Sequence, residues 1–125
     1  MTRPRLYLEE ILTCIDCIRE YTRAGRDDFK TNRMVQDAVI RNIEVIGEAS
    51  KCLPPELKAI EPVVPWRNIG AMRDLLIHRY FRIDLDRVWD VVVGDLDLLE
   101  AAVRRLLASI QPGTPDSASN DTANP

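Results

Sequence analysis

The side chains best suited to chemistry lie in one stretch of eight residues, Arg73-Asp74-Leu75-Leu76-Ile77-His78-Arg79-Tyr80. His78 is the only histidine of the chain. Cleavage of an RNA phosphodiester needs a guanidinium that binds phosphate, an imidazole that titrates near about pH 6.5, and a phenol that can stack or hydrogen-bond. Arg73, His78 and Tyr80 supply these three groups.

The spacing of these residues predicts how a helix would arrange them. Asp74 precedes His78 by four residues, so its carboxylate can hydrogen-bond the imidazole and fix its tautomer. Arg73 and Tyr80 share a face if the helix reaches that far. Arg73 and His78 are about 140° apart on an ideal helix, which favours two sides of one cleft over direct contact. A lone histidine more often packs in a core or caps a helix C-terminus, and the residues alone leave that alternative open.

Charge is segregated along this acidic chain, whose formal net charge is −3. That balance argues against a protein coated in basic residues for non-specific nucleic-acid binding. The segment 65–82 nevertheless carries a local charge of +3, whereas 84–100 carries −5. The arginines of the first segment beyond Arg73 are candidate RNA-binding side chains: Arg67, Arg79 and Arg82. An equally open alternative is that these charges pair across neighbouring helices on solvated faces.

The three cysteines, Cys14, Cys17 and Cys52, predict packing rather than chemistry. Their number is odd and no apolar leader opens the chain, so we expect reduced thiols in a cytoplasmic protein. Cys14 and Cys17 form a C-x-x-C inside a predicted helix, but a zinc site would need two further ligands. We therefore expect no metal and no cofactor. The apolar runs are also too short for a membrane span.

Helical periodicity and end signals predict an all-α fold. The expected elements are a helix from Pro4 to Arg23 capped by Thr2, a second helix capped by Thr31 or Asn32 and stopped by Pro54-Pro55, a helical turn at Glu56 to Ile60, a third helix from Pro65 to about 78–81, and a fourth from its cap Asp84 to Ile110. For 26–32, polar apart from Phe29, no element of its own is predicted.

Four long amphipathic helices joined by short connections are typical of an antiparallel four-helix bundle. Residues 111–125 contain no large apolar side chain, so they cannot bury enough surface to fold. The sequence thus predicts one helical domain over 1–110 and a disordered tail over 111–125.

The arrangement R-x-x-x-x-H-x-Y at Arg73, His78 and Tyr80 resembles the motif of HEPN-superfamily ribonucleases. It is most similar to the HepT-like toxins of type VII-like HEPN/MNT toxin–antitoxin systems. Similar blocks at 5–12, 36–49, 65–67 and 84–89 extend the likeness over about 3–107.

The resemblance implies a bundle that dimerises, brings two copies of the motif into one cleft, and cleaves RNA without a metal. Arg73 and His78 would be catalytic, with Asp74 and Tyr80 in support. The partner would be a minimal nucleotidyltransferase (MNT) antitoxin that transfers AMP to Tyr80. A non-catalytic helical adaptor, which binds a nucleotidyltransferase and its nucleotide or substrate, is the alternative.

A homodimer is also expected on chemical grounds. Cleavage through the ribose 2′-OH uses one group as base and another as acid, yet each chain has one histidine. Two copies of His78 across a two-fold axis would fill both roles. Tyr80, Arg73 or water could serve in place of the second histidine, and the sequence leaves these options open.

Overall fold

The computed structural model describes residues 3–78 and 84–110, with the side chains of 73–78 left out of that description. Every element in these ranges is helical, which confirms the all-α fold class. In chain order the elements are α1 (Pro4–Tyr21), α2 (Arg26–Thr31), α3 (Arg33–Lys51), α4 (Pro55–Lys58), α5 (Trp66–His78), α6 (Leu85–Asp90), η1 (Val91–Asp95) and α7 (Leu96–Ile110). The predicted cap Thr2 and the predicted tail 111–125 lie outside the described residues.

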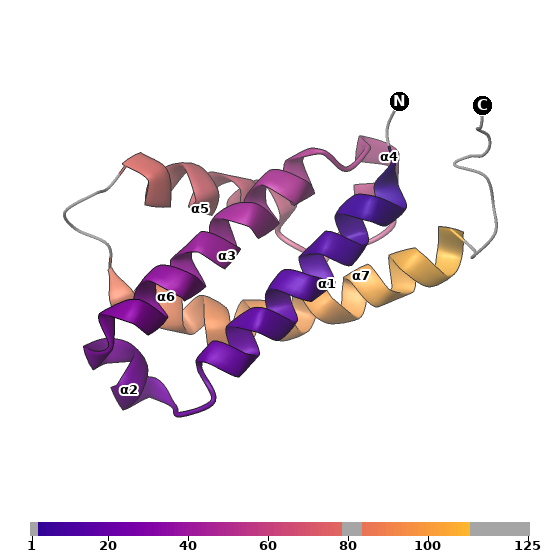
Figure 1. Ribbon diagram of the computed structural model, residues 1–125. Coiled ribbons are helices and arrows are strands. Elements are labelled where there is room, and N and C mark those ends of the chain that lie inside the picture. The colour runs from indigo at the N-terminus through magenta and orange to yellow at the C-terminus, as the bar shows by residue number, and fades with distance from the viewer. Residues whose placement is uncertain (1–2, 79–83, 111–125) are drawn as a thin grey trace.

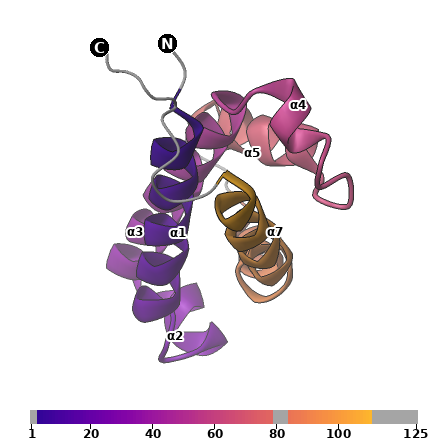
Figure 2. The same cartoon turned by 90° about the vertical axis from the view of Figure 1, so that its right-hand side faces the viewer.

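The helices form an antiparallel bundle, as predicted. α3 runs back along α1, α5 runs back along α3, and α6, η1 and α7 together form the fourth rod (Figure 1). α3 packs against both α1 and α5, and α1 packs against α7. Viewed from the side turned by 90°, α5 and α7 lie on the same side of the α1–α3 pair (Figure 2).

The core follows the apolar stripes of the sequence. On α1 the side chains of Leu8, Ile11, Ile15 and Ile18 recur every three or four residues, and all four are completely buried. Burial of such aliphatic side chains, at roughly 1.5–3 kcal/mol each, is the main driving force for closing the bundle.

The end signals also act as predicted at two helices. The side chain of Asn32 accepts the backbone N–H of Val35 at 3.3 Å and so caps α3. The carboxylate of Asp84 accepts the N–H groups of Asp86 at 3.0 Å and Arg87 at 3.3 Å at the start of α6. At α1, Arg3 stands at the cap position without a side-chain cap bond.

α2 is an element that the sequence analysis did not predict. It follows Gly25, whose φ of +98° is a conformation that side chains with a Cβ rarely adopt. Phe29 is its single buried side chain, and its ring lies 5.4 Å from that of Trp89 on α6. Gln36 on α3 donates to the Phe29 carbonyl oxygen at 2.9 Å. A six-residue helix with one buried apolar side chain shows no repeating apolar pattern, so hydrophobic periodicity could not predict it.

The fourth helix is not the uninterrupted α-helix that was predicted. Residues 91–95 form the π-helical turn η1, in which the amide of Leu96 donates to the carbonyl of Val91, five residues back. Its sequence Val-Val-Val-Gly-Asp combines β-branched residues with Gly94, and both are weak α-helix formers. The turn changes which residues of this rod face the bundle.

Charged side chains fasten the outer layer of the bundle. Arg19 on α1 donates to both Asp97 and Glu100 on α7, and the Arg19 hydrogen bond lowers the pKa of Glu100. Glu61, before α5, accepts two bonds from Arg105 on α7, at 2.9 and 2.7 Å. The bidentate geometry ties the α4–α5 connection to the fourth rod.

Two glycines predict opposite responses to alanine. An added Cβ would meet no atom within 4 Å at either Gly25 or Gly94, so packing is the same at both sites. Gly94→Ala should raise the free energy of unfolding by about 0.5–1 kcal/mol because alanine is the better helix former. Gly25→Ala should lower it by about 1 kcal/mol or more because of its positive φ. Thermal unfolding of the two variants measures both; shifts of the same sign would contradict the backbone argument.

Candidate functional site

Helix α5 carries the catalytic candidates. Arg73 and Asp74 lie in its last two turns, and His78 is its final residue. The helix is continuous from Trp66 to His78, so the predicted spacing falls on a single helical segment. Tyr80, Arg79 and Arg82 lie outside the described residues. Arg67, the remaining RNA-binding candidate, is exposed on the first turn.

The beginning of α5 is held firmly. The indole N–H of Trp66 donates to the carbonyl oxygens of Lys58 and Glu61, each at 3.1 Å. Gly70 is buried against α3, where an added Cβ would come within 3.2 Å of the Lys51 side chain. An alanine at Gly70 would press on the Lys51 side chain, so the glycine leaves room for this contact between α5 and α3.

A cavity of about 420 Å³ separates α5 from the fourth rod; we call it the α5 cavity. Its lining combines buried Ile43, Leu96 and Leu99, half-buried Pro65, Ile69, Met72 and Val91, and exposed Asn68, Ala71, Arg87 and Asp95. The deepest residues are therefore apolar and the polar groups lie at the opening. Because Met72 directly precedes Arg73, the cavity adjoins the backbone of the motif.

The bundle end that holds His78 also holds the start of α6 and α2 (Figure 1). Asp86 on α6 is paired there with Lys30 and with Arg26, the latter at 3.0 Å. The Lys30 hydrogen bond lowers the pKa of Asp86. Pairing across helices thus accounts for several acids of 84–100. Among the residues that the structure describes, their partners across helices come from α1 and α2, and Glu100 also pairs with Arg104 within α7. Neutralised in this way, Asp86 repels a nearby phosphate less.

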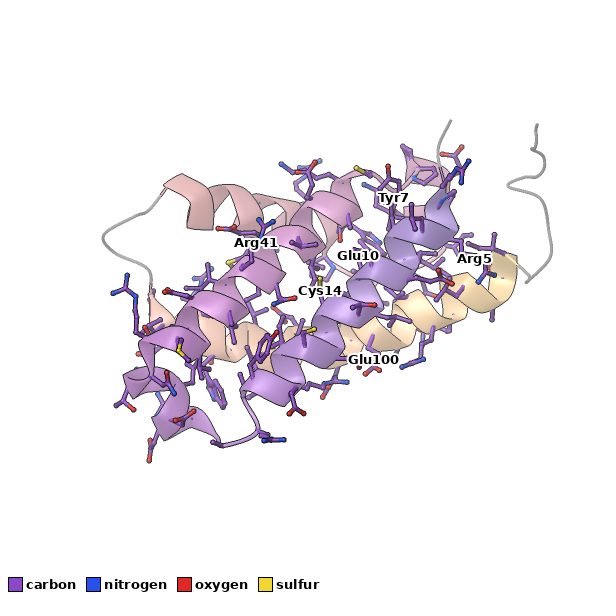
Figure 3. The ribbon with its side chains drawn as sticks, in the orientation of Figure 1. Arg5, Tyr7, Glu10, Cys14, Arg41 and Glu100 are labelled. Carbon is purple, nitrogen blue, oxygen red and sulfur yellow. The ribbon has the colours of Figure 1, made fainter. Side chains whose placement is uncertain are left out.

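A second cavity, of about 280 Å³, lies between α1 and α3 and is acidic. Its lining includes Glu10, Glu44 and Glu48 against Arg41, which lies 3.8 Å from Glu44. Figure 3 shows Glu10 on α1 and Arg41 on the neighbouring α3. The excess of carboxylates disfavours a polyanion on this face.

Of the three cysteines, Cys14 packs in the core as predicted, whereas Cys17 and Cys52 are only half-buried. All three are free thiols. Cys14 is 3% exposed, and burial raises the pKa of its thiol to about 11, with Glu10 adding to the effect. The thiol therefore stays protonated and unreactive at neutral pH. Among residues 3–78 and 84–110, no three His, Cys, Asp or Glu side chains come together as a metal site would require.

The motif, the helix that carries it and the bundle agree with one family. The sequence profile of the family described as Ribonuclease HepT-like matches residues 11–106. The chain belongs to the HepT-like ribonuclease family. That membership confirms the predicted resemblance, and the matched region contains every described helix except the start of α1 and the end of α7.

Two relatives of this HepT-like chain also carry ribonuclease names. It is 43% identical over 101 residues to a probable ribonuclease HepT from Thermococcus cleftensis, covering 80% of this chain and 92% of the relative. It is 37% identical over 108 residues to a protein named as a candidate RNase from Caldanaerobacter subterraneus, covering 86% and 96%.

A third relative is longer. This protein of Methanocaldococcus jannaschii, named as both a gamma-glutamylcyclotransferase and a candidate RNase, is 42% identical over 107 residues; the match covers 85% of this chain but about half (48%) of the relative. No solved structure matches the chain. In the part of the chain that the structure describes, no helix is both long and apolar enough to cross a membrane.

Sequence reasoning did not find the polar residues at the mouth of the α5 cavity. Asn68, Arg87 and Asp95 come from three different elements, α5, α6 and η1. No linear spacing connects them, and the π-helical turn that carries Asp95 leaves no periodic signal. The packing of the bundle brings them to one opening.

Proposed function

We propose that this HepT-like protein is a metal-independent endoribonuclease, the toxin of a type VII-like HEPN/MNT toxin–antitoxin pair, active in the cytoplasm. The observation that carries the proposal is the continuous helix from Trp66 to His78, which bears the R-x4-H spacing in a chain of the ribonuclease family. On a helix, Arg73 and His78 are separated by roughly 7.5 Å along the axis. A phosphodiester between these two side chains can be bound by Arg73, while His78 exchanges protons with the ribose oxygens beside it.

The chemistry follows from the side-chain types. His78 of one protomer takes the proton from the ribose 2′-OH, and the 2′-oxygen attacks phosphorus. The guanidinium of Arg73 stabilises the charge of the pentacoordinate phosphate. His78 of the second protomer gives a proton to the departing 5′-oxygen, so the products are a 2′,3′-cyclic phosphate and a free 5′-hydroxyl. Asp74, one helical turn before His78, orients the imidazole.

The proposed dimer provides the second histidine, and the proposed RNA-binding arginines are Arg67, Arg79 and Arg82. Arg67 is exposed and makes no ion pair with any described residue, which leaves its charge available for phosphate. The acidic cavity between α1 and α3 disfavours binding of RNA on that face of the molecule.

Control by an antitoxin completes the proposal. A minimal nucleotidyltransferase transfers AMP from ATP to the phenol oxygen of Tyr80, two residues beyond the end of α5 in the sequence, with loss of the phenol proton and release of pyrophosphate. The adduct would add bulk and negative charge beside the arginines of 73–82. Both effects oppose the binding of RNA.

The decisive experiment compares the wild type with His78→Ala on labelled single-stranded RNA, in EDTA and in Mg²⁺. We expect the wild type to cleave equally well in both buffers and to leave a cyclic phosphate, and the variant to lose at least about 100-fold in rate. Light scattering on the active sample should give a dimer. Failure of the purified wild type to cut any RNA, combined with binding to the nucleotidyltransferase, would instead support the adaptor.

A further inference from the structure

We infer that the α5 cavity is a pocket for one nucleobase of the RNA strand, and that Asn68 and Asp95 read the edge of that base. The inference deepens the proposed function by assigning a specificity site. Its volume of about 420 Å³ falls within the roughly 300–1,000 Å³ of small-molecule sites.

The interior of the cavity suits the face of a flat ring. Ile43, Leu96 and Leu99 are nearly fully buried at its base, while Ile69 and Met72 form part of its walls. Bases that leave a stack are held between apolar or aromatic side chains, and a thioether makes favourable contacts with a ring. The apolar surface of the cavity can therefore replace the neighbours that a base loses on unstacking.

The opening suits the edge of a base. The Asn68 amide offers a donor and an acceptor, Asp95 offers acceptors, and Arg87 offers donors. All three are exposed, and none of these side chains makes a hydrogen bond or ion pair within the described part of the chain. By contrast, Asp86, Asp97 and Glu100 on the same rod are all paired.

Mixed donors and acceptors match the edge of a base better than they match a simple anion or an apolar protein surface. A phosphate alone would be repelled by Asp95. An apolar partner would remove water from the charges of Arg87 and Asp95 without giving them a hydrogen-bond partner. The Watson–Crick edge of each base presents both donors and acceptors, and amide or carboxylate side chains discriminate among bases on that ground.

The π-helical turn contributes to this arrangement. Val91 and Asp95, its first and last residues, both line the cavity. Such turns inside α-helices occur frequently at functional sites. Met72 directly precedes Arg73, so a base in the cavity would belong to a nucleotide close to the phosphate that Arg73 is proposed to bind.

The three methionines permit a direct test of occupancy. Met72 lines the cavity, whereas Met34 on α3 is 79% exposed and absent from the lining. With ¹³C-methyl methionine, titration with AMP, GMP, CMP and UMP should shift the Met72 signal for at least one nucleotide and leave Met34 unmoved. Ribose 5-phosphate, which lacks a base, should shift neither.

Matched variants test the reading of the base. Asp95→Asn and Asn68→Ala alter the opening, whereas Asp90→Asn changes an exposed acid of the same rod outside the lining. Oligonucleotides with a single ribonucleotide and each of the four bases beside it give a ratio of kcat/KM among bases. We expect Asp95→Asn and Asn68→Ala to change that ratio by at least about fivefold and Asp90→Asn to preserve it.

The two readouts separate this inference from the proposed function. A Met72 shift in a protein that cuts no RNA would support the pocket while refuting the nuclease. Cleavage with no Met72 shift for any nucleotide would refute the pocket alone. Equal base ratios in wild type and in both opening variants would also overturn it, as would a Met72 signal that responds to protein concentration but to no nucleotide, because a second copy would then fill the cavity.

Discussion

Arg73→Ala should lower the rate of RNA cleavage by about 100- to 1,000-fold, the range found when one preorganised donor to a developing oxyanion is removed. A planar guanidinium can bind two phosphate oxygens at once, and its charge is needed most when phosphorus becomes pentacoordinate. Arg73→Lys keeps the positive charge but cannot bind two phosphate oxygens at once, so we expect its rate to exceed that of Arg73→Ala only slightly. Single-turnover kinetics at saturating enzyme isolate the chemical step.

Arg33→Ala is the matched control for this prediction. Arg33 is exposed on α3, and among the described residues it pairs only with Asp37, one turn away, so its loss should leave the rate within about twofold of wild type. Circular dichroism and the thermal midpoint, measured for each variant, separate loss of chemistry from loss of fold. Wild-type cleavage by a folded Arg73→Ala protein would remove Arg73 from the proposed mechanism.

Co-expression with a cognate nucleotidyltransferase should increase the intact mass of the chain by one or more AMP units, and Tyr80→Phe should abolish the increase completely. Phenylalanine keeps the ring but lacks the oxygen that accepts the nucleotide, so the effect is all or none. The adduct places a phosphodiester close in sequence to Arg73, Arg79 and Arg82, and should silence cleavage along with the mass shift.

Tyr21→Phe provides the control, because Tyr21 is an exposed phenol at the end of α1, outside the motif. It should carry the same adducts as the wild type. A chain that is silenced without any mass increase would mean inhibition by binding alone, which would refute modification of Tyr80.

The long helices could be predicted because each buries one continuous stripe, and because side chains such as Asn32 and Asp84 mark their starts. α2 could not be predicted in this way. Its formation depends on the contact of Phe29 with Trp89, which lies sixty residues away in the sequence. The π-helical turn at 91–95 was equally hidden, since Val92 and Leu96 keep the apolar spacing of an ordinary α-helix across it.

The placement of Arg73 and His78 on one helix could be predicted because they lie within two turns of each other. The polar residues at the opening of the α5 cavity could not, since their meeting depends on how α5, α6 and η1 pack in the bundle. Asn68 and Asp95 lie on separate elements and become neighbours only through that packing. Linear patterns thus locate chemistry that one helix carries, and miss sites that several helices share.

The start of α1 and the end of α7 both lie at the end of the bundle opposite His78 (Figure 1). α1 has 18 residues, and a helix of that length spans roughly 27 Å. A fluorescent protein, an affinity handle or a surface linker joined beyond either helix can therefore be attached without obstructing the end where RNA is expected to enter. Immobilisation through these ends should present every molecule to substrate in the same orientation.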